Sequence, residues 1–347
     1  MTIDKVFDGD GHVVEKEHVL LDYFDPPYRG NTRLLDSAFY PTLDGWHRQA
    51  SSIADGTKGR QAQPDDVGAW LSMMDRSGIE HAVIYPSRGL GVGFLRDPEW
   101  AAAVCRAYNN FLSENYIKAS PRVHGVALLP MQDVDEAVKE LNRCVTQLKM
   151  QGGVIAPVGL PFPAGHPNYH PVYAEAERLD CVIGIHGAPA TGLGVDHLSK
   201  LIQARVLTHP FAQMVHLTSI VLEGVLEKYP KLRLLSLEAG ACWLAFLLDR
   251  LDWEWEKRGS RQAPLLKKTP SEYLKRGQVF INCDVKERII PALISLVGEE
   301  CLFYASDYPH ERDQEETIAY LRSREDLSET AKDRILYHNA KGCYRIH

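Results

Sequence analysis

The feature that most constrains the fold of this chain is an alternation of short apolar runs with longer helical patterns. Eight runs rich in Val, Ile and Leu have the length and composition of β-strands, at residues 5–10, 81–86, 123–129, 153–157, 181–186, 232–238, 278–282 and 301–307. Strands that alternate with helices pair in parallel, and eight such units close most naturally into a (β/α)8 TIM barrel, an α/β fold. An open doubly wound sheet is the runner-up, but no Gly-rich phosphate loop follows the first strand.

The segments between these strands predict the helices and one long insertion. Helical spacing of apolar residues covers 65–78, 98–118, 134–150, 168–179, about 210–229, 241–257, 286–298, 313–323 and 328–345. Residues 16–64, rich in Pro, Gly and Asp, form a connection too long for a simple turn, which is typical of a functional insertion or lid. No repeat or break in composition marks a second domain, so we expect one domain over residues 1–347.

Composition excludes several classes of function. The net charge of −7 and the pI of about 6.1 favour neither nucleic acid nor an anionic membrane as a partner. No apolar run reaches the length of a membrane span. The seven cysteines are never paired as CxxC, and the first residues lack the basic and apolar regions of a signal peptide. We therefore expect free thiols and a cytoplasmic location.

The first strand passes into alternating ionisable residues, Asp8, Asp10 and His12. Side chains two apart on a strand point to the same face, and burying three such groups is costly without a counter-charge. A divalent cation supplies one, because carboxylate oxygen and imidazole nitrogen are good ligands for zinc or manganese. Gly9 and Gly11 leave room for a close approach to the backbone. An Asp/Gly turn followed by a solvated histidine explains this stretch equally well, so the rest of the chain must decide.

Other strands also end in residues that bind metals. His186 ends the fifth strand, Glu238 the sixth and Asp307 the eighth. In a barrel the C-terminal strand ends meet at one mouth, and the first and eighth strands are neighbours. We therefore expect Asp10, His12 and Asp307 to lie together, with His186 across the mouth. Two imidazoles and two carboxylates make a plausible mononuclear metal site with an open position for water.

Weaker candidates surround this set. Residues that could contact a substrate are Arg88, His209 and Trp46. His310 follows Asp307 closely and could face the substrate or orient Asp307, while Glu15 could fix the tautomer of a metal-bound histidine. Each also has an ordinary explanation as a solvated, capping or core residue. No nucleophile elbow is present, which argues against a serine hydrolase.

The chain resembles the amidohydrolase superfamily, and within it the group that includes aminocarboxymuconate-semialdehyde decarboxylase and γ-resorcylate decarboxylase. The segments that carry the resemblance are 8–15, 185–187, 224–233, 237–240 with Trp243, and 305–310. The resemblance implies a barrel with one catalytic divalent ion, most often zinc and sometimes manganese. Carried over by position, the ligands would be Asp10, His12, His186 and Asp307, and Asp307 would also transfer a proton.

The chain departs from the superfamily pattern at two positions. The commonest first motif is His-x-His, whereas this chain has Asp10-Gly-His12. The sixth strand usually ends in a histidine that contacts metal or substrate, whereas this chain has Glu238. Glu238 could hold a ligand, polarise a substrate group or simply pair with an arginine.

Two chemistries compete for this site. We predict hydrolysis of a small, aromatic or conjugated carboxylate-type substrate, with a metal-activated water, Asp307 as base and then acid, and Glu238 and His310 as further catalytic groups. The alternative is non-oxidative decarboxylation, in which Asp307 or His310 protonates the carbon that loses carbon dioxide. Glu238 in place of histidine favours hydrolysis, while the named relatives favour decarboxylation. A non-catalytic metal-binding barrel is the remote third possibility.

We also expect the chain to form a homodimer or a higher homo-oligomer. This expectation rests on the resemblance and on the aromatic-rich stretch 243–255, which carries more apolar surface than a solvated outer helix needs.

Overall fold

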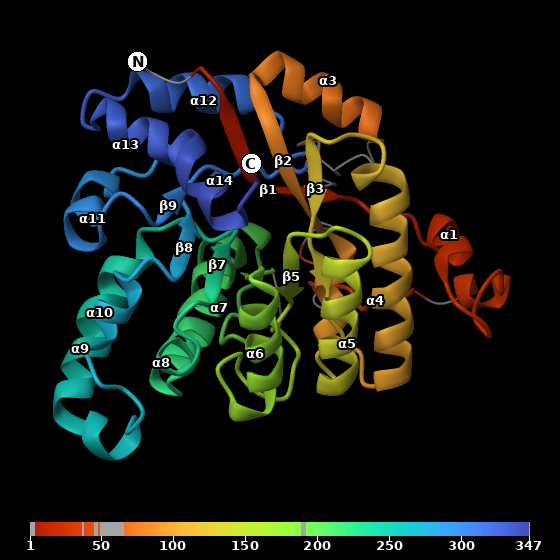
Figure 1. Cartoon of the computed structure of the whole chain (residues 1–347), viewed down its shortest axis with the longest axis horizontal. Helices are drawn as coiled ribbons and strands as arrows, with labels where there is room; N and C mark the ends of the chain where they lie inside the picture. The colour runs from red at the N-terminus through yellow and green to blue at the C-terminus, as the bar shows by residue number, and fades with distance from the viewer. Residues whose placement is uncertain (1–3, 37, 45–47, 49–65, 189–191, 347) are drawn as a thin grey trace.

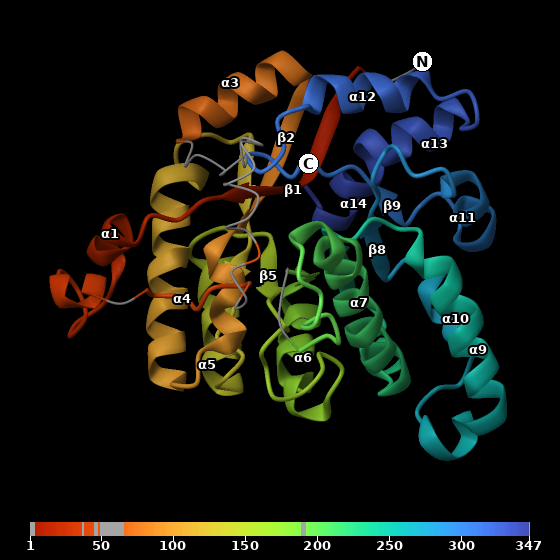
Figure 2. The ribbon, with the colours of Figure 1, turned by 180° about the vertical axis from the view of Figure 1, so that it is seen from behind.

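A computed structural model describes residues 4–36, 38–44, 48, 66–188 and 192–346. Within these ranges nine strands pair in parallel in two sheets (Figures 1 and 2). The first sheet contains β1 (Val6–Val13), β2 (Ile79–Pro86) and β3 (Val123–Gly125), in that order. The second contains, in order, β4 (Ala127–Leu128), β5 (Gly152–Ile155), β6 (Val182–His186), β7 (Arg233–Leu237), β8 (Val279–Asn282) and β9 (Leu302–Phe303). The predicted α/β class and parallel pairing are confirmed.

Backbone hydrogen bonds connect the two sheets at both edges. The predicted strand 123–129 is divided into β3 and β4 at Val126, and Gly125 O of β3 accepts a hydrogen bond from Gln151 N–H, directly before β5, at 2.9 Å. At the other edge, backbone hydrogen bonds join β1 to residues 304–308, which include the bond from Asp307 N–H to Asp10 O (3.1 Å). The segment after β9 therefore runs beside β1, as expected for the first and last strands.

The helices follow the strands in the predicted alternation. The longer ones are α3 (Val67–Ser77), α4 (Pro98–Leu112), α5 (Val134–Thr146), α6 (His170–Leu179), α7 (Leu201–Leu222), α9 (Trp243–Gln262), α11 (Ile290–Val297) and α12 (Gln314–Ser323). Short helices are α1 (Glu17–Leu20), α8 (Val225–Lys228), α10 (Pro270–Leu274), α13 (Glu329–Asp333) and α14 (Asn339–Tyr344). The 3-10 turns are η1 (Leu21–Tyr23), η2 (Thr32–Asp36), η3 (Arg88–Phe94) and η5 (Pro167–Tyr169), and the π-helical turns are η4 (Ser113–Ile117) and η6 (Arg334–His338).

Local sequence explains where several of these helices begin. Asp66, Asp97 and Asp133 precede α3, α4 and α5, and each side chain accepts a hydrogen bond from a backbone N–H in the first turn. Such caps satisfy donors that have no partner within the helix.

The largest difference from the predicted helices is in α7. The sequence predicted a helix from about residue 210, after a loop that follows the fifth strand. The helix instead begins at Leu201 and continues through Pro210, which forfeits one backbone hydrogen bond. His209 was expected in a loop and lies in this helix, among its buried residues.

Two glycines let bulky side chains pack directly against β1. A Cβ atom at Gly11 would lie 2.2 Å from a ring carbon of Trp70, and one at Gly9 would lie 2.5 Å from a ring carbon of Phe303. Both separations are far below van der Waals contact, so larger residues would displace these rings. The predicted close approach to the backbone is confirmed, and the neighbours are α3 and β9.

The described part of the segment after β1 lies at the edge of the molecule. α1 and the residues after it project beside α4 in both views (Figures 1 and 2). Phe24 stacks on Trp100 of α4, with ring centroids 5.4 Å apart, so this aromatic residue is a packing residue. Among the helices of the described residues, none has both the length and the hydropathy of a membrane span.

Candidate metal centre

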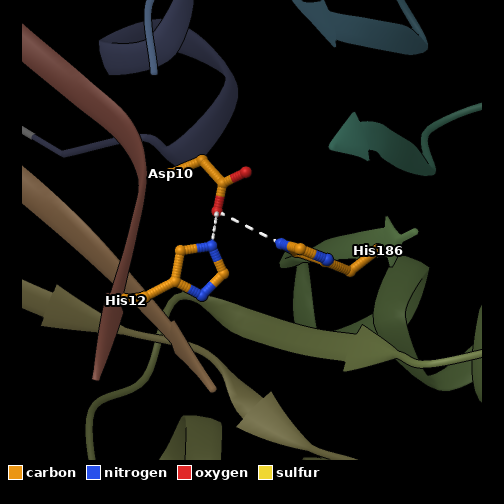
Figure 3. A group of neighbouring side chains, drawn as sticks. All are labelled: Asp10, His12 and His186. Carbon is orange, nitrogen blue, oxygen red and sulfur yellow. Dashed lines mark ion pairs between the residues drawn. The ribbon is translucent and has the colours of Figure 1, made fainter. Parts of the chain in front are cut away.

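Three side chains from two strands converge at the C-terminal strand ends. Asp10 and His12 come from β1 and His186 from β6, and they point toward one another (Figure 3). Asp10 Oδ1 lies 3.8 Å from His12 Nε2 and 3.6 Å from His186 Nε2. All three residues are buried.

The hydrogen bonds of the two imidazoles assign their tautomers. His12 Nδ1 lies 3.0 Å from Pro86 O, and His186 Nδ1 lies 2.6 Å from Gly187 O. A carbonyl oxygen only accepts hydrogen bonds, so each Nδ1 carries a hydrogen, and in the neutral imidazole each Nε2 keeps a free lone pair. Both lone pairs face Asp10, which is the usual arrangement of histidines that bind a metal.

Two further carboxylates reach the same point. Asp307 Oδ1 lies 3.5 Å from His12 Nε2, and Glu238 Oε2 lies 3.7 Å from His186 Nε2. Both residues adopt a left-handed backbone, with φ of +50° at Asp307 and +52° at Glu238. That conformation costs a non-glycine residue roughly 1–2 kcal/mol. Such strained positions cluster at functional sites, where the surrounding structure holds them in place.

The donor atoms fit one divalent cation. Asp10 Oδ1, His12 Nε2, His186 Nε2 and Asp307 Oδ1 are all buried and have no hydrogen-bond partner among the described residues. Two atoms bound to one ion at about 2.1 Å lie at most about 4.2 Å apart. Each carboxylate–imidazole separation given above meets this limit. The donor atoms of Asp10, His12 and His186 lie within 4.8 Å of one another, and Asp307 belongs to a second such group that shares His12. Buried donors without partners are otherwise costly.

The charges of these groups explain why a cation would be stabilising. Burial, Glu238 and Asp10 raise the pKa of Asp307 well above its ordinary value. Burial lowers the pKa of His186, but the Asp10 carboxylate more than offsets this and raises the pKa to about 9. Burial also opposes ionisation of Glu238, yet His209 and the other imidazoles hold its pKa well below the ordinary value. A bound cation would favour anionic carboxylates and neutral imidazoles throughout.

His310 lies beside the proposed donor groups, next to His12. Its Nε2 lies 2.8 Å from Ser87 Oγ, and its ring centroid lies 4.9 Å from that of His12. His310, His12 and Asp307 also offer donor atoms within 4.8 Å of one another. Ser87, which directly follows β2, was not predicted to orient this histidine, because only the fold brings the two residues together.

Glu15 orients a loop rather than a histidine. Its carboxylate accepts hydrogen bonds from Arg88 N–H (2.8 Å), Gly89 N–H (3.0 Å) and Ser87 N–H (3.3 Å). Burial raises its pKa to about 7. The predicted contact with a metal-bound histidine is wrong, since His12 is oriented by a backbone carbonyl.

Asp8 does not join Asp10 and His12, although the alternation placed all three on one face. Its Oδ1 accepts a hydrogen bond from Ser306 N–H (2.9 Å) and its Oδ2 accepts one from Ser306 Oγ (2.5 Å). The pairing of β1 with β2 shifts register between Asp8 and Gly11, which breaks the alternation. Burial raises the pKa of Asp8 to about 7 despite these hydrogen bonds. Asp8 therefore holds the backbone that precedes Asp307.

Of the three residues predicted to contact a substrate, one is found at the metal centre. His209, on α7, reaches the centre, with Nε2 3.4 Å from Glu238 Oε1. The Arg88 side chain is 59% exposed and lies 3.9 Å from Glu17, so its contact with a substrate remains a prediction. Trp46 lies outside the described residues.

Two residues of α7 were missed in the sequence. Arg205 is exposed one turn before His209, and its charge opposes the burial-driven rise in the pKa of Asp307. Gln213 is buried and its Nε2 donates hydrogen bonds to Ile185 O (2.7 Å) and Leu237 O (2.9 Å). The spacing of four residues from His209 was the available signal for both, but it required α7 to begin before residue 210.

Comparison with known proteins agrees with this geometry. The family described as Amidohydrolase matches residues 8–346. The chain is 24% identical over 249 residues to 2-amino-3-carboxymuconate-6-semialdehyde decarboxylase of Dictyostelium discoideum, covering 72% of this chain and 68% of that protein. It is 26% identical over 292 residues to γ-resorcylate decarboxylase of Rhizobium sp., covering 80% of this chain and 84% of that protein.

Solved structures share the fold at low identity. The 5-carboxyvanillate decarboxylase of Sphingomonas paucimobilis is similar with a TM-score of 0.78 and 20% identity, over 99% of this chain and 100% of that one. A dihydroxybenzoic acid decarboxylase of Polaromonas sp. is similar with a TM-score of 0.74 and 20% identity, over 99% of this chain and 97% of that one. The latter structure contains manganese and the inhibitor 2-nitroresorcinol.

Proposed function

Because the chain belongs to the amidohydrolase family, we propose that it is a metal-dependent decarboxylase of a small aromatic carboxylate. The observation that carries this proposal is a partly exposed carboxyl group, Asp307, beside a buried donor set, in a chain whose relatives include γ-resorcylate decarboxylases. Glu238 in place of histidine had favoured hydrolysis as the prediction. The relatives support the alternative, decarboxylation, better.

We propose Asp10, His12, His186 and Asp307 as ligands of one divalent cation. When bound, the cation supplies a positive centre that balances the buried carboxylates and attracts the oxygen atoms of a substrate. Manganese is the first candidate, because carboxylate donors suit it and the Polaromonas structure contains it. The zinc ion predicted from the sequence has no comparable support.

Asp307 is the proposed proton donor. Its side chain is 22% exposed, as is that of Glu238, whereas that of Asp10 is 3% exposed, so a substrate can reach Asp307 but not Asp10. In the metal-free site burial, Glu238 and Asp10 raise its pKa. With the cation bound, a substrate carboxylate beside Asp307 would favour the protonated acid in the same way, because like charges disfavour ionisation. When the bond between ring and carboxylate breaks, carbon dioxide leaves and the electron pair remains on the ring carbon. Asp307 gives its proton to that carbon and regains one from water.

His310 offers a donor atom within 4.8 Å of Asp307, and the charge of Arg205 acts on Asp307. The hydrogen bond from Ser87 holds the His310 ring beside His12. Arg205 offers the positive charge that a substrate carboxylate requires, and its exposed position on α7 leaves it free to move toward a ligand. We propose that these two residues orient the substrate, while Glu238 belongs to the metal centre as argued below.

The proposal is tested by following the product in labelled solvent. The manganese-loaded protein is incubated with a panel of hydroxybenzoates and related aromatic acids, amides and ring-cleavage products. Decarboxylation must release carbon dioxide and place solvent deuterium on the ring carbon. Oxygen from labelled water in the product, without carbon dioxide, would establish hydrolysis instead. Turnover of none of the panel by protein that binds the metal would favour the non-catalytic alternative.

We further propose that the two sheets form one closed (β/α)8 barrel and that residues 1–347 form one domain. The support is the backbone hydrogen bonding between β1 and residues 304–308, together with the bond from Gln151 N–H to Gly125 O. A single cooperative unfolding transition observed by several probes is the expected outcome.

Self-association and location remain proposals that rest on surface chemistry. Trp243 is buried, but Phe246 and Trp253 on the same helix are 62% and 52% exposed. We propose that this face of α9 contributes to a homodimer or a higher homo-oligomer, which light scattering at micromolar concentration would show. All seven cysteines are free, so we also propose a reducing, cytoplasmic compartment.

A further inference from the structure

Glu238 stands where the sequence resemblance led us to expect a histidine. It follows β7 directly, and its Oε2 lies 3.7 Å from His186 Nε2 and 4.0 Å from His12 Nε2. The same two nitrogens lie 3.6 Å and 3.8 Å from Asp10 Oδ1. Glu238 and Asp10 thus each present one oxygen to the same pair of imidazole lone pairs.

The second oxygen of Glu238 has a different neighbour. Glu238 Oε1 lies 3.4 Å from Nε2 of His209, which is buried on α7. His209 Nδ1 in turn lies 3.3 Å from Thr208 Oγ1. One oxygen of the carboxylate therefore faces the donor set, and the other faces an imidazole from a different element.

The backbone on both sides of Glu238 is fixed by buried hydrogen bonds. Before it, Gln213 Nε2 donates to Leu237 O at 2.9 Å and to Ile185 O at 2.7 Å, which ties the end of β7 to the residue that precedes His186. After it, the Glu287 carboxylate accepts hydrogen bonds from the backbone N–H groups of residues 241 and 242. These contacts hold the left-handed conformation of Glu238.

An ordinary surface ion pair does not explain this arrangement. Among the described residues, the ion pairs of Glu238 are with His12, His186 and His209, and none is with an arginine. The other nitrogens of two of these imidazoles donate to carbonyl oxygens, so in the neutral form both imidazoles present lone pairs to Glu238. Such a lone pair repels a carboxylate oxygen, and a shared cation makes the contact favourable.

We propose that Glu238 Oε2 is a fifth donor of the metal centre and that His209 is the positioning residue that directs it there. This inference rests on the proposed metal site and extends it. The donor set then contains three carboxylate oxygens and two imidazole nitrogens. Oxygen-rich sets of this size suit Mn²⁺ better than the tetrahedral preference of Zn²⁺.

The test measures metal binding rather than turnover. Purified full-length protein is stripped with a chelator and titrated with Mn²⁺, and free ion is followed by electron paramagnetic resonance. Glu238→Gln keeps the shape of the side chain and removes its charge, and we expect Mn²⁺ affinity to fall about 10–100-fold. Glu238→Asp keeps the charge but withdraws the oxygen by one methylene, and we expect a smaller loss. The matched control, Glu256→Gln, changes an exposed glutamate on α9 and should leave affinity unchanged.

The His209 variants show whether His209 acts on Glu238 through its N–H donor or only by filling space. His209→Leu should weaken Mn²⁺ binding several-fold and change the spectrum of the bound ion, while His209→Gln, which keeps an N–H donor, should recover most of the affinity. His338→Gln, at an exposed histidine, is the control.

Each outcome bears on a different claim. Folded Glu238→Gln and Glu238→Asp proteins that both bind Mn²⁺ as tightly as the wild type would overturn the fifth donor. Equal affinity in His209→Leu and wild type would overturn the positioning role. Failure of the wild type to bind any divalent ion would instead overturn the metal centre of the proposed function.

Discussion

Two histidine pairs on the strands differ in what their nitrogen atoms contact. At the C-terminal ends, His12 Nε2 and His186 Nε2 have no hydrogen-bond partner among the described residues. Toward the other end, His81 on β2 and His124 on β3 bond to each other, with Nδ1 and Nε2 3.1 Å apart. Both pairs are clusters of ionisable groups on parallel strands. Only the first leaves lone pairs that converge on one point, and that difference identifies the site.

The carboxylates near the two pairs differ in the same way. Beside His81, Glu80 lies 2.5 Å from Lys5 and also accepts a hydrogen bond from Tyr337. Burial alone would raise the pKa of Glu80, but these two partners lower it. Asp307, at the other end, has its pKa raised by burial and by neighbouring carboxylates. A satisfied carboxylate stabilises the fold, whereas a crowded one is available for binding or proton transfer.

The largest expected effect comes from removing a donor at the site. His186→Ala should lose more than about 100-fold in metal affinity while remaining folded, because a lost ligand costs more than a lost supporting contact. Metal content by mass spectrometry and circular dichroism measure the two quantities. His81→Ala is the matched control and should keep its metal. Full occupancy in His186→Ala would remove this residue from the donor set.

The second prediction concerns Asp307, whose pKa is raised by burial and by neighbouring carboxylates. Asp307→Asn keeps the shape and one oxygen but no longer exchanges a proton. We expect it to retain much of its metal and to lose at least about 100-fold in kcat, the usual scale for a general acid. Glu80→Gln, at the satisfied carboxylate, should turn over normally. Near-normal kcat in Asp307→Asn would contradict the assignment of the proton donor.

The third prediction tests the hydrogen bond from Ser306 to Asp8, which holds the backbone that precedes Asp307. Ser306→Ala removes the hydroxyl that donates to Asp8 and leaves a buried carboxylate oxygen without that partner. Loss of such a bond should destabilise the fold by about 1–3 kcal/mol, measured by denaturant unfolding. Ser295→Ala, at an exposed hydroxyl on α11, is the control. Equal stability of the two variants would show that Asp8 does not need this hydrogen bond.

The smallest expected effect concerns His81 and His124, the pair whose ring nitrogens bond to each other. Burial lowers the pKa of His124 to about 4 from its ordinary value of 6.5. A lowered folded-state pKa means that the neutral histidine stabilises the fold above pH 6.5 and that this contribution is lost as the pH falls toward 4. Between pH 8 and pH 5.5, the free energy of unfolding of His124→Gln should therefore fall by about 1 kcal/mol less than that of the wild type. Thermal unfolding at both pH values measures this, and parallel curves would contradict it.

The sequence predicted which residues end the strands better than it predicted which residues contact one another. Asp10, His12 and His186 could be placed at one mouth because hydrophobic runs stop at them and parallel strands align their ends. Asp8 could not be separated from Asp10, since a register shift within β1 depends on pairing with β2. The long start of α7 was also hidden, because Pro210 is a boundary signal in most contexts.

The sequence by itself determined the α/β class, the order of strands and helices and the residue types at the strand ends. These depend on local periodicity, which every window of the chain contains. The tertiary structure alone decided which oxygen of Glu238 faces the imidazoles, which serine orients His310 and which glutamine joins β6 to β7. Those contacts join residues from about 24 to more than 200 positions apart and depend on backbone conformations such as the left-handed Glu238 and Asp307. No local pattern encodes them, because they arise only when the packed strands and helices bring distant groups within bonding distance.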